Sequence, residues 1–300
     1  TPGTPLAVNL DVPGRQTMLT FTATAGQTMA LQLSSLATTP AGKGVGFRVY
    51  RANGDLIAAA SNVTTPTTFN LPDLTAGTYA VFLAPRDAAM GTAQVTLVNG
   101  VSGALPTNGS TQSFSTALPS QNAYFTFSGT AGDDVSLAIT NLALTPNPPS
   151  GISWSVIAPD GYQLGGSTTC SASVTPGCTK DSNLNDSPLI NLPLTGTYRV
   201  IVGPQGAATM SFSLTLSQDL ATALTAGTPL NVNLDAPGRQ GFLPFSVTAG
   251  QTGAVHFSSL AMTPAGKAVG FRVYRSNGEI IANVSVTTSA TFNLTNLTAG

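Results

Sequence analysis

A long internal repeat is the feature that most constrains what this chain can fold into. The stretch GTPLAVNLDVPGRQ (Gly3–Gln16) returns as GTPLNVNLDAPGRQ (Gly227–Gln240), an offset of 224 residues. The same offset holds for GFRVYR, which begins at Gly46 and again at Gly270. Identity of this strength within one chain indicates a tandem duplication, in which each copy is one folding unit.

The middle of the chain carries a divergent copy of the same pattern. AYFTFSGTAG (Ala123–Gly132) aligns with MLTFTATAG, SWSVIAPDG (Ser153–Gly161) with GFRVYRANG, and LTGTYRVIVGP (Leu194–Pro204) with LTAGTYAVFLAP. The order of the copies is therefore A–B–A′. We predict three domains: an A-type domain over residues 1–100, a B-type domain with a disulfide-loop insertion over 101–219, and a truncated A-type repeat over 220–300.

The third copy stops earlier than the first. Gly300 corresponds to Gly77, after which the first copy continues with TYAVFLAPRDAAMGTAQVTLV, a run that predicts two strands. A sandwich without two core strands leaves apolar side chains and strand edges uncovered. We expect those strands to come from a longer chain of which this is a piece or from a neighbouring copy, so the predicted partner is the protein itself.

Apolar residues alternate with polar ones throughout all three copies. The inward positions of one such run are Leu19 and Phe21, Phe125 and Phe127, and Leu243 and Phe245. This alternation is typical of half-buried antiparallel strands, and the Asn-Gly or Asp-Gly pairs between runs predict tight hairpins. Frequent glycine and proline oppose long helices. The sequence therefore predicts an all-β fold of tandem antiparallel β-sandwich domains, jelly-roll-like, with the third one incomplete.

These motifs carry a family resemblance. The run F-x-F-x-x-x-A-G, a strand pair around Asn-Gly or Asp-Gly, and L-x-x-G-T-Y resemble bacterial pre-peptidase C-terminal-type β-sandwich domains, which occur in tandem in large secreted or cell-surface repeat proteins. The resemblance covers all three copies. It implies an extracellular or cell-surface spacer, adhesive or binding module, and it brings no catalytic residue with it.

The composition removes several classes of function. Charged residues make up 8% of the chain and the net charge is −1, whereas a nucleic-acid binder needs a clustered basic surface. No apolar run approaches the roughly 18 residues of a membrane span. The single histidine, His256, stands where the other copies have Gln32 and Ala138, so we interpret it as an outward residue of a strand. We predict no enzyme and no cofactor.

The insertion in the B-type copy contains two candidate sites. Cys170 and Cys178 flank seven residues in CSASVTPGC, a spacing that suits a disulfide. Such a bond indicates an oxidising compartment. The following KDSNLNDSP offers alternate oxygen donors loosely like a calcium loop, but it lacks the turn glycine and the closing Glu, so a polar turn is the competing interpretation. The calcium candidates are Asp181, Asn183, Asn185 and Asp186.

The A-type copies also share an outward pair of residues. Arg48 and Tyr50 recur as Arg272 and Tyr274. Arg and Tyr are favoured at protein contacts, and Tyr stacks on sugars. We take these four residues as interface candidates, while an ordinary exposed strand face remains the alternative.

Two functions follow from this pattern. The first is a structural extracellular repeat protein that forms a fibre, sheath or stalk by head-to-tail arrangement of its domains. The alternative is a set of accessory glycan- or protein-binding modules of a secreted enzyme or adhesin.

The disulfide is open to direct measurement. We expect peptide mass mapping of the unreduced protein to find Cys170 and Cys178 joined in one cross-linked species, because their spacing closes a short loop. Two free thiols in the native protein would contradict the prediction.

Overall fold

The computed structural model describes residues 2–146, 151–170, 177–179, 189, 191–263 and 265–300. Every regular element in these residues is a β-strand, which confirms the all-β class. The chain divides into two compact units. The first is Thr1–Leu220 with Asn233–Gln240, and the second is Ala221–Val232 with Gly241–Gly300.

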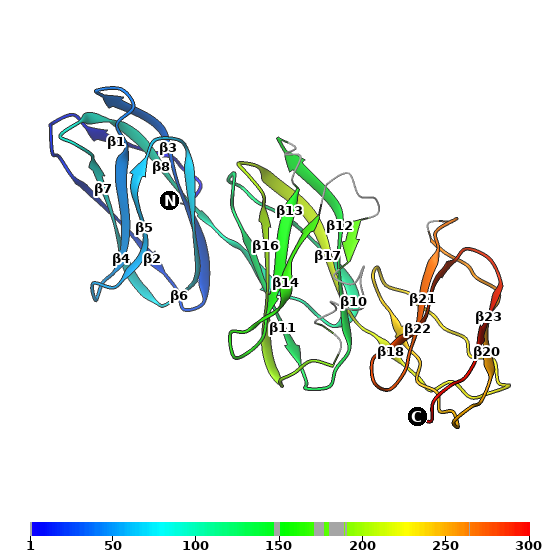
Figure 1. The fold of residues 1–300 in the computed structure, drawn as a ribbon. Coiled ribbons are helices and arrows are strands. Elements are labelled where there is room, and N and C mark those ends of the chain that lie inside the picture. Colours follow the sequence, from blue (N-terminus) through cyan, green and yellow to red (C-terminus); the bar gives the residue numbers. More distant parts are fainter. Residues whose placement is uncertain (1, 147–150, 171–176, 180–188, 190, 264) are drawn as a thin grey trace. The chain divides into compact units, whose positions relative to one another are not determined.

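The first eight strands form a jelly-roll sandwich (Figure 1, blue to cyan). One sheet has the order β1 (Leu6–Leu10), β8 (Met90–Asn99), β3 (Gln27–Thr39) and β6 (Thr67–Leu74). The other has the order β2 (Thr17–Ala23), β7 (Gly77–Pro85), β4 (Val45–Arg51) and β5 (Leu56–Val63). All of these pairings are antiparallel. Two four-stranded sheets in this order confirm the predicted jelly-roll sandwich.

Alternation along each strand builds the core of this first sandwich. On β4 the side chains of Phe47 and Val49 are fully buried, while Arg48 between them is exposed. On β7, Tyr79, Val81 and Leu83 are buried in the same way. Because successive side chains of a strand point to opposite faces, each sheet presents one apolar face to the other. Fully burying one large apolar side chain contributes about 1.5–3 kcal/mol.

The second sandwich repeats this topology (Figure 1, green). One sheet has the order β10 (Asn108–Ser115), β17 (Thr209–Gln218), β12 (Val135–Thr145) and β15 (Gly177–Thr179). The other has the order β14 (Gln163–Cys170), β13 (Ile152–Ile157), β16 (Gly196–Pro204), β11 (Ala123–Gly129) and β9 (Val101–Ala104). Strand β9 pairs with β11 in parallel, the one addition to the plan of the first sandwich. Its core is a cluster separate from the first and contains Trp154, the largest of the fully buried side chains, which is 1% exposed.

The second unit keeps two of the pairings. Strand β20 (Gly253–Phe257) pairs with β23 (Ala290–Leu294), as β3 does with β6, and β21 (Val269–Tyr274) pairs with β22 (Ile280–Val286), as β4 does with β5. The two-residue strands β18 (Leu220–Ala221) and β19 (Gly241–Phe242) pair with each other. The partly buried Phe245, Val255 and Phe271 pack against its small core.

One predicted strand is not found there. Leu243 and Phe245 correspond to Leu19 and Phe21 of β2, yet residues 243–249 are not a strand. In the first sandwich β2 has a single neighbour, β7. With no strand equivalent to β7 beside it, this segment forms no continuous ladder: Val247 exchanges two backbone hydrogen bonds with Gly300, and the Pro244 carbonyl accepts one from Leu224.

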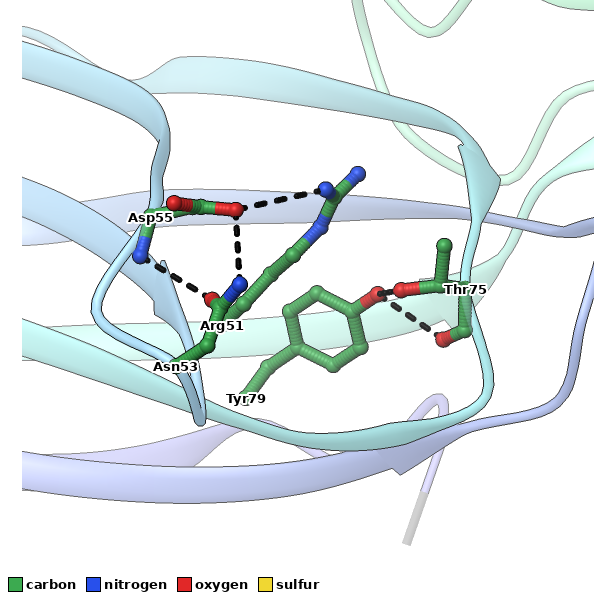
Figure 2. A network of polar contacts seen from close by, with 5 residues as sticks. All are labelled: Arg51, Asn53, Asp55, Thr75 and Tyr79. Carbon is green, nitrogen blue, oxygen red and sulfur yellow. Dashed lines mark hydrogen bonds and ion pairs between the residues drawn. The ribbon is translucent and has the colours of Figure 1, made fainter.

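The turn after β4 shows how a hairpin is closed with few residues. Figure 2 shows Asn53 and Asp55 facing one another across it: the backbone N–H of Asp55 donates to Asn53 Oδ1 at 3.1 Å, and Asn53 Nδ2 donates to Asp55 Oδ2 at 2.8 Å. Arg51 lies 3.7 Å from the same carboxylate. Gly54 has a φ of 92°, the left-handed conformation that glycine adopts without strain.

In each of the first two sandwiches a buried tyrosine, Tyr79 on β7 or Tyr198 on β16, fixes the turn, here called the corner, that precedes its strand. Tyr79 donates its hydroxyl to the carbonyl of Thr75 at 2.8 Å, as Figure 2 shows. In the second sandwich the hydroxyl of Tyr198 bonds both backbone groups of Leu194, donating to the carbonyl and accepting from the N–H. The corner therefore has its otherwise unpaired backbone groups satisfied by one side chain.

We expect Tyr198→Phe to lower the free energy of unfolding of the second sandwich by about 0.5–1.5 kcal/mol, because the backbone N–H and carbonyl of Leu194 both lose the hydroxyl that bonds them. Urea unfolding followed by fluorescence measures this sandwich selectively, since Trp154 is the one tryptophan of the chain. Tyr162→Phe is the control, because Tyr162 is 68% exposed. Equal effects of the two substitutions would contradict the role of the corner.

Candidate functional site

The outward face of the β2–β7–β4–β5 sheet is the candidate site of the first sandwich. Across it, Met18 is paired with Phe82, Phe82 with Arg48, and Arg48 with Ala59. Residues directly opposite in antiparallel strands share one face. These side chains therefore form a row, and a second row of Thr20, Ala80, Tyr50 and Leu56 lies beside it. We call the two rows the sheet-face patch.

The patch combines exposed apolar atoms with an arginine. Met18 is 60% exposed and Leu56 is 53% exposed. Tyr50 and Phe82 are half-buried, with ring centroids 5.6 Å apart at an edge-on angle of 83°. Arg48 is exposed, and its side chain has no ion pair or hydrogen bond among the described residues. A guanidinium with its donors free next to aromatic rings can bind hydroxyl, carbonyl or carboxylate oxygens.

The corresponding face of the third copy differs. Arg272 is half-buried and its Nε donates to Asn283 Oδ1 at 3.1 Å, where the first sandwich has Ala59. The hydroxyl of Tyr274 is buried and has no hydrogen-bond partner. The structure therefore places all four predicted interface residues on strands, Arg48 and Tyr50 on β4 and Arg272 and Tyr274 on β21. Of the two arginines, the side chain of Arg272 has a hydrogen-bond partner and that of Arg48 has none among the described residues.

The structure describes some of the remaining predicted site residues and not others. His256 is exposed on β20, as predicted, and its Nδ1 lies 2.8 Å from Thr291 Oγ1. Within the described residues no three His, Cys, Asp or Glu side chains gather where a metal could bind. The calcium candidates Asp181, Asn183, Asn185 and Asp186 lie outside the described residues.

The predicted disulfide is also outside what the structure describes in full. Cys170 is buried at the end of β14. Cys178 is on β15, but its side chain is not among those described. The pairing of the two cysteines therefore stays a prediction.

A shallow hollow of about 230 Å³ lies among residues of the first two sandwiches. Thr28, Asp73, Tyr124 and Arg199 are on its wall. Asp73 and Arg199 form an ion pair with each other, so their charges are already matched. Pockets for small molecules usually measure about 300–1,000 Å³, and we therefore do not place the site here.

The loop that precedes β11 is bound to residues of the first sandwich. Thr68 donates to the carbonyl of Pro119 at 2.6 Å, and the backbone N–H of Asn122 donates to Asn70 Oδ1 at 2.8 Å. Leu118 of the same loop packs into a small buried cluster with Ala30 and Val98. The first two sandwiches are thus joined by specific side-chain contacts as well as by the chain.

A polar cluster of Ser136, Asp219 and Gln240 lies at one end of the second sandwich. Ser136 donates to Asp219 Oδ1 at 2.6 Å, and the backbone N–H of Gln240 donates to the same oxygen at 3.2 Å. Burial raises the pKa of Asp219, these two hydrogen bonds lower it, the nearby Asp134 carboxylate raises it, and Arg239 lowers it. The net direction is upward. Burial of the charged form is therefore the dominant effect.

Sequence reasoning missed several of these residues. Phe82 was readable, because it is an aromatic residue at an outward position of a strand whose other outward residues are Thr78, Ala80 and Ala84. Ser136 and Asp219 gave no signal, since the chain is rich in serine and their partner Gln240 is 104 and 21 residues away respectively.

Comparison with known proteins identifies no family. No protein-family model matches the chain, and no curated protein matches it. The resemblance to pre-peptidase C-terminal-type domains therefore stays a prediction.

Solved structures with similar segments include three bacterial proteins. The tandem CBM22-1–CBM22-2 domains of Paenibacillus barcinonensis Xyn10C are 10% identical, with 66% of this chain and 82% of that one covered and a TM-score of 0.23. A secreted protein of Parabacteroides distasonis is 8% identical, with 70% and 88% covered and a TM-score of 0.19. The Clostridium perfringens ZmpB M60 domain with CBM51-1 and CBM51-2 is 7% identical, with 73% and 38% covered and a TM-score of 0.20. At these scores the similarities carry no argument about this chain.

No helix long and apolar enough to cross a membrane occurs in the part of the chain that the structure describes.

Asp219 makes the stability of the second sandwich depend on pH. A carboxyl whose folded pKa is raised stabilises the fold below its unfolded pKa, and this contribution is lost as the pH rises through the folded pKa. We therefore expect the wild type to lose unfolding free energy, relative to Asp219→Asn, as the pH rises from acidic to neutral. The amide of the variant keeps an acceptor oxygen and acquires no charge over this range. Trp154 fluorescence in urea titrations at several pH values measures this, and a difference that does not change with pH would contradict it.

Proposed function

We propose that the chain is a non-catalytic accessory module that works outside the cell and binds a glycan through the sheet-face patch of its first sandwich. The observation that carries the proposal is the unpaired, exposed Arg48 beside the half-buried rings of Tyr50 and Phe82. A protein surface is the alternative ligand of the same patch.

The shape of the patch favours an extended ligand. It lies on the outward face of a four-stranded sheet, and its members are aligned directly across neighbouring strands. A sugar ring can pack its apolar face on Tyr50 or Phe82, while the Arg48 guanidinium donates to hydroxyl or carboxylate oxygens. Exposed Met18 and Leu56 extend the apolar area on either side.

The chemical inventory supports a non-catalytic role. The chain has one histidine and its described residues contain no cluster of three potential metal ligands. The low charge and the predicted disulfide support an extracellular location.

A second function is supported by a different observation. The hydrogen bonds of Thr68 and Asn70 to the loop before β11 hold two sandwiches together, which suits a spacer or stalk. Regular filaments in electron micrographs of the purified chain would favour this structural function, whereas discrete particles would favour the binding module.

Glycan binding is tested by native affinity electrophoresis of the full chain through a panel of neutral and acidic soluble polysaccharides. We expect at least one polysaccharide to retard the wild-type protein. Arg48→Ala and Tyr50→Ala should each weaken that retardation at least about tenfold, which corresponds to about 1.4 kcal/mol of binding free energy.

Tyr162→Ala is the matched control, since it removes an exposed tyrosine from the turn between β13 and β14 of the second sandwich. Slow exchange of the Phe47 amide shows that each variant keeps the first sandwich folded. The proposal fails if no polysaccharide retards the wild type, or if Tyr162→Ala loses as much binding as Tyr50→Ala.

A further inference from the structure

The four residues Pro-Gly-Arg-Gln occur in two loops of the same local structure. In the loop Asp11–Gln16, Arg15 N–H donates to the Val12 carbonyl at 3.0 Å and the Arg15 side chain pairs with Asp11. In the loop Asp235–Gln240, the same turn has a distance of 3.1 Å and the same ion pair is present. The fold of the loop is therefore set by its own sequence.

The surroundings of the two loops differ. Every residue of Asp11–Gln16 is exposed, and Val12 is 53% exposed. In the other loop, Ala236 and residues 238–240 are half-buried, and the exposed fraction of the arginine side chain falls from 49% to 26%. The same sequence thus buries its surface in one place and leaves it uncovered in the other.

The end of the second sandwich accounts for this burial. Besides the bond from the Gln240 N–H to Asp219, Gln240 Nε2 donates to Ser136 Oγ at 3.3 Å, and the Leu220 N–H donates to the Gln240 carbonyl at 2.9 Å. Ala236 also packs closely on Gly109, where an added Cβ would lie 2.9 Å from the alanine Cβ. Three hydrogen bonds and one close contact therefore dock this loop.

The end of the first sandwich has different chemistry. Aligning β3 with β12 and β8 with β17 by their register, Leu31 opposite Leu97 and Leu137 opposite Leu216, puts Ala30 in the place of Ser136. By the same register, Val98 takes the place of Ser217, and Gly100 that of Asp219. The loop docked there carries Leu118 against this apolar surface. At the A-type end Leu118 packs on Ala30 and Val98, and Gln121 of the same loop donates to the backbone carbonyl of Asn99. At the B-type end Gln240 instead bonds the side chains of Ser136 and Asp219.

We propose that the exposed loop Asp11–Gln16 is a docking surface for the end of a B-type sandwich. The occupant is a B-type sandwich joined ahead of the loop in the same polypeptide, with a serine and an aspartate placed as Ser136 and Asp219 are. Gln16 makes the contacts of Gln240, and Val12 lies against the glycine that corresponds to Gly109. The matching of loop to sandwich end fixes the order in which A-type and B-type domains alternate. This inference goes beyond the proposed function and does not depend on it.

The test is a fusion in which a copy of residues 101–224 precedes Thr1 of the full chain. This keeps the 21 residues that separate Asp219 from Gln240 in the chain, now between the added aspartate and Gln16. Hydrogen exchange of the Gln16 amide is measured in the fusion and in the parent chain. We expect exchange to slow at least about tenfold in the fusion, because the amide gains an acceptor and a covering surface.

An end-swapped fusion is the matched control. Its added copy carries Ser136→Ala, Ser217→Val and Asp219→Gly, which convert a B-type end into an A-type end. Each fusion contains two tryptophans, one in each B-type copy, so the swapped copy counts as folded when the amplitude of the fluorescence change in urea equals that of the unaltered fusion. Slowing at Gln16 in the unaltered fusion alone supports the proposal. Equal exchange in the unaltered fusion and the parent, or equal slowing in both fusions, overturns it.

Discussion

The backbone pairing that β7 and β8 each make with two neighbouring strands, in separate sheets, is the interaction on which the rest of this fold depends. Strand β7 lies between β2 and β4, and β8 lies between β1 and β3, so each holds two neighbours in its sheet. Strands β1 and β2 have no other partner. In the third copy, where the pairings of β3 with β6 and of β4 with β5 recur, residues 227–240 and 243–249 are not strands. Local alternation makes a strand possible, and pairing makes it form.

This distinction explains what the sequence could and could not predict. The jelly-roll sandwich was predictable, because inward residues such as Phe47 and Val49 alternate with outward ones and glycine-containing turns separate the runs. The strand around Leu243 and Phe245 was predicted wrongly. Its alternation of apolar and polar residues is intact, but a strand also needs a neighbour to pair with, and the neighbour of the corresponding β2 is β7, which lies far away in the sequence. The Arg48–Tyr50 pair was found from its recurrence, whereas its position beside Phe82 and Met18 follows from the cross-strand register, which sequence patterns do not give.

The faces and the ends of the sandwiches serve different purposes. Arg48, Tyr50 and Phe82 lie on a sheet face, away from the residues that join one sandwich to the next. The ends carry Ala30 and Val98 in one type and Ser136 and Asp219 in the other. The described ion pairs are mostly local and exposed, and such pairs contribute about 0–1 kcal/mol. Cohesion between sandwiches therefore depends on buried apolar contacts and on hydrogen bonds to side chains at the ends.

The central claim is that a sandwich end, and not the loop sequence alone, determines how a Pro-Gly-Arg-Gln loop is held. Amide hydrogen exchange of the unmodified chain tests this most directly, since both loops are present in one molecule. We expect the Gln240 and Leu220 amides to exchange much more slowly than the Gln16 amide, because they donate to Asp219 and to the Gln240 carbonyl. Equal exchange rates at Gln16 and Gln240 would contradict the claim.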